Sequence, residues 1–104
     1  MKKYAILTFM AKGISTGTAP NETSGARLNE GKTNSLQRRR DGSADDLIRN
    51  DDGTVKQFIS QVDALNYCVI LGWNLEQTIF ESGYGFNARD PLSTFIFILS
   101  KNES

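Results

Sequence analysis

The side chains that could do chemistry in this 104-residue chain are carboxylates, arginines and a single cysteine, because the sequence contains no histidine. The lack of histidine excludes Ser-His and Cys-His nucleophile pairs, histidine-ligated zinc and the two-His-one-carboxylate iron site. Cys68 lies beside Val69 on the apolar side of an expected helix, and no basic residue is adjacent in sequence to activate its thiol. We expect this cysteine to be buried and inert.

Two pairs of neighbouring carboxylates, Asp45-Asp46 and Asp51-Asp52, fall in expected turns. Nothing around them indicates the apolar pocket that raises a carboxyl pKa for acid–base catalysis. The Asn-Asp-Asp-Gly run at residues 50–53 is similar to part of a calcium loop. Placing its glycine at the sixth loop position, however, puts Ile48 and Ile59 where oxygen ligands are required. We therefore expect a hairpin turn here, no metal site, no cofactor and no enzymatic activity.

An alternative function is nucleic-acid binding through an arginine run and two stacking aromatic rings. The residues that would make these contacts are Arg38, Arg39, Arg40, Arg49, Tyr84 and Phe86. Acids follow the arginine run closely and cancel its field within a Debye length of ~8 Å. The chain as a whole has twelve basic and twelve acidic residues, whereas phosphate binding normally needs a basic surplus. We therefore rank nucleic acid below protein as the partner.

The element predicted most clearly is a helix over residues 61–71. Ser60 followed by Asp63 resembles a capping box, in which both side chains satisfy backbone N–H groups at the start of a helix. Gly72 ends the helix, because glycine adopts a positive φ without steric cost. One apolar face recurs at helical spacing and consists of Val62, Leu65, Cys68 and Val69.

The remaining pattern predicts strands at residues 3–10, 73–80 and 94–99, with a hairpin of 46–50 and 54–59 around an Asp-Gly turn. Residues 34–40 are a further candidate, as a short edge strand. Residues 11–33 contain four glycines and a proline and are predicted to be irregular. The sequence thus predicts one α+β domain over 1–104, with a long polar insertion at about 11–45. Its fold would be a mainly antiparallel sheet of about four to five strands with one short helix packed on one face.

A helix of three turns is too short to cover a sheet of this size, so one sheet face should stay open. The strand at 94–99 is apolar on both sides, which is typical of a central strand or of one half covered by a partner. An uncovered apolar face commonly binds a second copy, and two-fold dimers are the commonest assembly. The residues predicted to carry this self-association are Phe80, Ile96 and Ile98.

The Ala-Leu-Asn-Tyr run at residues 64–67, followed by Leu-Gly-Trp-Asn-Leu at 71–75, resembles a group of small uncharacterised bacterial proteins. The resemblance covers residues 1–10 and about 46–101, and Asn74 stands where that pattern usually has an acid. It implies a fold, and neither an activity nor catalytic residues. Physically, the motif has a structural explanation, in which glycine reverses the chain and tryptophan packs between helix and sheet. The residues of this structural motif are Ser60, Asp63, Leu65, Asn66, Gly72 and Trp73.

Together these observations predict a non-catalytic protein-interaction module that acts as a cytoplasmic bacterial homodimer and binds a protein partner. One cysteine cannot form an internal disulfide, and no stretch approaches the ~18 apolar residues of a membrane-spanning helix. The apolar run near the N-terminus is expected to be a strand rather than a signal peptide, because no small-x-small cleavage site follows it. A second alternative is a small-molecule binder in which residues 11–33 form a lid over a pocket near Trp73.

Overall fold

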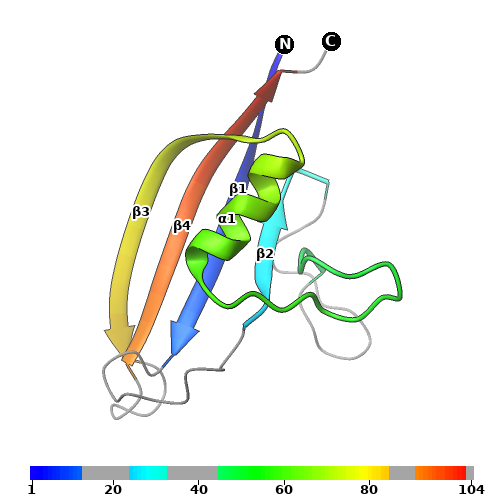
Figure 1. Cartoon of the computed structure of the whole chain (residues 1–104). Coiled ribbons are helices and arrows are strands. Elements are labelled where there is room, and N and C mark those ends of the chain that lie inside the picture. Colours follow the sequence, from blue (N-terminus) through cyan, green and yellow to red (C-terminus); the bar gives the residue numbers. More distant parts are fainter. Residues whose placement is uncertain (13–23, 33–44, 85–90, 103–104) are drawn as a thin grey trace.

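The computed structural model describes residues 1–12, 24–32, 45–84 and 91–102, which form four strands and one helix. The strands are β1 (Lys2–Lys12), β2 (Ala26–Asn29), β3 (Asn74–Tyr84) and β4 (Pro91–Asn102), and the helix is α1 (Gln61–Ile70). They build one antiparallel sheet in the order β2-β1-β4-β3, with α1 on one side of it (Figure 1). The predicted α+β fold with a single helix is therefore confirmed.

The core lies between α1 and the side of the sheet that the helix covers. The pairing of β1 with β4 places alternate residues of both strands on this α1 side, and these are almost fully buried. Successive side chains of a strand point to opposite faces, so the side chains on the α1 side are buried in the core, while those on the other face, which are also largely apolar, point away from α1. The core residues that the sheet supplies are Ala5, Leu7, Phe9, Ala26, Phe97 and Leu99, and they pack with Phe58, Ala64, Cys68 and Trp73.

The helix begins where the sequence predicts and ends at Ile70, one residue before the predicted end, and only part of its predicted apolar face meets the core. Ser60 is the N-cap, and Gly72 follows the helix at a φ of +100°. The residues facing the core are Ala64 and Cys68, whereas Val62 and Val69 are exposed, so the predicted apolar face was wrong for these two valines. Both stripes recur at helical spacing, and the pattern alone could not say which one packs inward.

A β-bulge at Leu75/Gln77 shifts the register of β3 against β4. An extra residue in one strand moves every later side chain to the opposite face. Leu75 therefore lies on the α1 side, while Gln77 and Ile79 lie on the other face, contrary to the predicted alternation. The same shift places Phe80 opposite Phe95 on the α1 side.

This register places the three residues predicted to carry self-association on two different faces of the sheet. Ile96 and Ile98 pair with Thr8 and Ile6, on the face away from α1. Phe80 lies on the α1 side and is therefore not part of that face.

The segment predicted to be irregular contains β2, which the sequence analysis missed. Its outer edge is joined by two later segments through bridges between Arg27 and Leu47 and between Ser24 and Phe58. The predicted hairpin is reduced to a turn with the single bridge Arg49–Val55. β3 also continues to Tyr84, through residues expected to begin a loop. The candidate strand at 34–40 lies outside the described residues.

Candidate functional site

The predicted capping box forms as expected and has a structural role. The Asp63 amide donates to Ser60 Oγ at 3.1 Å, and the Ile59 amide donates to Asp63 Oδ2 at 3.1 Å. Each side chain thus accepts a hydrogen bond from a backbone N–H at the helix start, which is the reciprocal arrangement of this motif. Leu65 packs against the core from the same helix, and Asn66 is exposed.

The aromatic ring of Trp73 is engaged by the chain's own cations. Trp73 is only 2% exposed, and the Lys101 ammonium lies 4.4 Å from its ring centroid, with that of Lys3 at 5.8 Å. An ammonium held over an indole face is stabilised by the ring quadrupole. Gly72 precedes the tryptophan and lies against Lys101, whose Cε would be 3.5 Å from an added Cβ. Gly72 and Trp73 therefore contribute to the packing of the core after the helix, which agrees with the structural role expected for this motif.

Cys68 is a core side chain with 0% exposure. Burial raises the pKa of its thiol to about 11, and the nearby Glu30 carboxylate contributes to the increase. Because the thiolate is the reactive form, the neutral thiol is a poor nucleophile and a poor metal ligand. The prediction that Cys68 is buried is confirmed, and the inertness of its thiol stays a prediction that the raised pKa supports.

The acidic run at residues 50–53 is a hairpin turn. Gly53 has a φ of +90°, and its amide donates to the Asn50 carbonyl at 3.0 Å. The hydroxyl of Thr54 donates to Asp52 Oδ1 at 2.6 Å, and this bond, with a second from the Thr54 amide, lowers the pKa of Asp52. Within the described ranges, no three acidic or cysteine side chains cluster where they could hold a metal ion.

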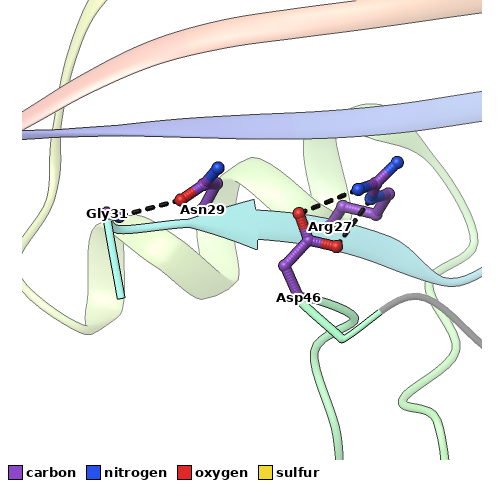
Figure 2. Close-up of polar contacts among 4 residues, drawn as sticks. All are labelled: Arg27, Asn29, Gly31 and Asp46. Atoms are coloured by element: carbon purple, nitrogen blue, oxygen red, sulfur yellow. Dashed lines mark hydrogen bonds and ion pairs between the residues drawn. The ribbon is translucent and has the colours of Figure 1, made fainter. Parts of the chain in front are cut away.

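The sequence analysis missed an ion pair between Arg27 and Asp46, which are 19 positions apart (Figure 2). Arg27 Nε and Nη2 donate to the two Asp46 carboxylate oxygens at 2.6 and 3.1 Å. The Asp46 side chain is 2% exposed and that of Arg27 is 30% exposed. The guanidinium thus neutralises the charge of a buried carboxylate and links residues 45–48 to β2. No local sequence signal could identify this pair, because it depends on the bridge between Arg27 and Leu47.

A shallow hollow of about 260 Å³ lies beside this ion pair. It is lined by apolar and charged residues, namely Leu28, Glu30, Lys32, Asp45, Asp46, Leu47, Ile48, Tyr67 and Leu71. Trp73 is not among them, so this hollow differs in place from the pocket expected near the tryptophan. Its one buried carboxylate, that of Asp46, is already held by Arg27.

Most of the predicted nucleic-acid set lies outside the described residues. This applies to Arg38, Arg39, Arg40 and Phe86, and of Tyr84 only the strand position opposite Pro91 is described. Arg49 Nη1 donates to the Gly53 carbonyl at 3.0 Å, within the hairpin turn. Figure 1 places that turn beyond β2, across the sheet from the end of β3. The structure therefore does not bring Arg49 and position 84 together, and nucleic-acid binding stays a prediction.

The most extensive candidate surface is the sheet face opposite α1, which we call the open face. Its apolar side chains come from three adjacent strands and are Tyr4, Ile6, Met10, Ile79, Ile96 and Ile98. Three of them are exposed, by 57% for Tyr4, 47% for Ile6 and 41% for Met10. No described helix or strand packs over this face. Such a surface can bind another apolar surface, and it carries no catalytic constellation.

A cluster of three polar side chains lies at one end of the open face. The Ser100 hydroxyl donates to Glu76, and the Lys2 ammonium lies 3.1 Å from Glu76 Oε1. These bonds, the one from Ser100 first, lower the pKa of Glu76. Apolar residues with a polar group at the margin are the usual composition of a protein–protein interface.

Comparison with known proteins gives no relative for this chain, since no family model, curated protein or solved structure matches it. The resemblance to uncharacterised bacterial proteins therefore stays a prediction. The described part of the chain contains no helix long and apolar enough to cross a membrane.

Proposed function

We propose that this chain is a non-catalytic protein-interaction module that works as a homodimer, with two copies packed through their open faces. The observation that carries the proposal is the open face itself, where β1, β3 and β4 together present six apolar side chains. Two sheets that pack face to face lie ≈10 Å apart and interdigitate such side chains. Pairing with a second copy would remove them from water, which is the main favourable term in association.

Two further features support an interaction role over a catalytic one. The only thiol is buried and neutral at physiological pH, and the buried carboxylate of Asp46 is bound by Arg27. Both groups thus serve the packing of the domain. The open face, in contrast, makes no contribution to the core described above.

The proposal is tested by size-exclusion chromatography with light scattering at tens of micromolar protein. We expect a mass twice that of the 11.5 kDa chain, or a multiple of that dimer. Ile6→Glu places a charge at the centre of the open face and should abolish this contact. Val62→Glu is the matched control, because Val62 is similarly exposed, at 54%, but lies on the outer side of α1.

Circular dichroism of both variants verifies that each is folded. A monomeric wild-type chain would contradict the proposal. So would an Ile6→Glu variant that keeps the wild-type mass, or a Val62→Glu variant that loses it.

A further inference from the structure

The outer edge of β3 is a second surface, and the part of the chain that the structure describes leaves it unpaired. β3 is the last strand of the sheet, is 11 residues long, and pairs only with β4 among the described residues. An unpaired edge exposes a row of backbone N–H and C=O groups that can accept another strand. Proteins commonly protect such edges with proline or lysine, and β3 contains neither. Its one irregularity, the bulge at Leu75/Gln77, leaves residues 77–84 in regular register with β4.

Apolar side chains accompany this edge on the α1 side of the sheet. Leu75 and Phe80 are exposed by 45% and 55%, and the Phe80 ring lies 5.0 Å from that of Phe95. Figure 1 shows why these side chains are exposed: α1 lies over β1 and towards β2 and leaves β3 uncovered. A strand added to β3 would therefore bury apolar surface as well as satisfy backbone groups.

One register of β3 with a second copy gives the longest overlap of the two strands. A two-fold axis perpendicular to a sheet makes two edge strands antiparallel and keeps each residue on its own face. When that axis passes through Ile79, the two 11-residue strands overlap along their length, and residues 77–81, beyond the bulge, pair in regular register. Ile79 then faces its own copy, Thr78 faces Phe80, and Gln77 faces Glu81.

Charge is compatible with this register. β3 carries two acids, Glu76 and Glu81, and no basic residue. With the axis at Ile79, Glu81 is opposite the amide of Gln77, and Glu76, at the bulge, is not opposite an acid. An axis at either acid would instead set two carboxylates directly opposite one another, which is destabilising.

We propose that the β3 edges of two copies pair antiparallel about a two-fold axis at Ile79, which joins their four-stranded sheets into one continuous sheet. This contact goes beyond the proposed homodimer, because it uses a different surface. With both contacts in place, two open-face dimers associate through their edges. The β3 edge is thus a specific interface for a second copy.

Cysteine cross-linking tests the register directly. Directly opposed residues have Cα atoms ≈4.5–5.5 Å apart, within reach of a disulfide, whereas residues offset by two positions are generally too distant. Under mild oxidation, Ile79→Cys should form a covalent dimer with itself. A mixture of Thr78→Cys and Phe80→Cys should form a covalent heterodimer, while each of these alone should form much less. The native Cys68 does not interfere, because it is buried and burial raises its pKa to about 11.

The same cross-linking experiment distinguishes the contact through the β3 edge from the contact through the open face. Repeated with Ile6→Glu added, which removes the open-face contact, the cross-links should persist with unchanged register. If neither the Ile79→Cys homodimer nor the Thr78→Cys/Phe80→Cys heterodimer forms, the edge proposal is overturned. A β3 edge that accepts a strand of a different protein would also give this result. Cross-linking of a Val62→Cys control at a similar yield would also overturn it, because that would indicate random collision. Neither result bears on the open face, which the light-scattering measurement tests.

Discussion

The described residues pair along one edge of the sheet, that of β2, and leave the edge of β3 unpaired. At the β2 edge, the amides of Leu28 and Ile48 bond the carbonyls of Asp46 and Ala26 at 2.9 Å, and Phe58 pairs with Ser24. At the β3 edge, the described residues supply no such partner. The first edge contributes to folding stability, whereas the second is the edge for which we propose association with another copy.

The side chains at the two edges also differ, being buried at the β2 edge and exposed at the β3 edge. Phe58 at the β2 edge is 1% exposed and makes an edge-on contact with Tyr67 at 5.6 Å, whereas Phe80 at the β3 edge is 55% exposed. The ion pair at the β2 edge contains a buried carboxylate, and the one on β3, between Lys2 and Glu76, is exposed on both sides. Equivalent substitutions at the two edges should therefore have unequal effects on the folded monomer.

The largest difference is expected between Phe58→Ala and Phe80→Ala. Deleting a fully buried phenylalanine costs ~3–5 kcal/mol of unfolding free energy, which is a large part of a small domain's stability. Phe80→Ala removes a half-exposed ring and its contact with Phe95, and should cost less than about 1.5 kcal/mol. Urea denaturation followed by tryptophan fluorescence measures both. Equal losses would show that the two edges contribute alike to folding, contrary to the comparison.

Sequence patterns predicted the elements whose signals are local. The Ser60–Asp63 cap, the glycine stop at Gly72 and the apolar, strand-forming runs of β1 and β4 are each encoded within a few consecutive residues. The helix bounds and the α+β class could therefore be derived from them.

What the sequence could not predict depends on contacts between distant residues. β2 is four residues long and is a strand because it lies between β1 and the 46–48 segment, so its own propensity did not identify it. The bulge at Leu75/Gln77 leaves no periodic signal, yet it decides that Phe80 lies on the α1 side. An open apolar face was predicted, and the register of β3 against β4 shows that Phe80 does not belong to it.

A second, smaller difference is expected between the two ion pairs. Arg27→Met leaves the buried Asp46 carboxylate without its cation and should lower the unfolding free energy by about 2–3 kcal/mol. The double variant Arg27→Met/Asp46→Leu should recover much of that loss, because no buried charge remains. Lys2→Met breaks the exposed pair with Glu76 and should cost much less than Arg27→Met, because water screens both charges. Chemical denaturation of the three variants checks this, and a double variant no more stable than Arg27→Met would contradict it.

The smallest effect concerns the pKa of Glu76, the acid that joins β3 to β1 and β4. Its pKa is lowered first by the hydrogen bond from the Ser100 hydroxyl and then by Lys2. Because the folded pKa lies below the unfolded value of ~4.3, the stabilisation is complete above that value. It is lost as the pH falls through the lowered folded pKa. Acidification through this lowered pKa should therefore weaken the attachment of β3.

NMR titration of the Glu76 carboxyl group measures this directly. We expect Ser100→Ala to raise the pKa of Glu76, and Lys2→Met to raise it by less, because the hydroxyl is the larger cause. The reverse order would mean that the Lys2 charge, which salt screens, holds this end of β3. An unchanged pKa in both variants would show that neither bond persists in solution. In that case β3 would be attached by its backbone pairing with β4 alone, and the contrast with the buried Asp46 pair at the β2 edge would be sharper still.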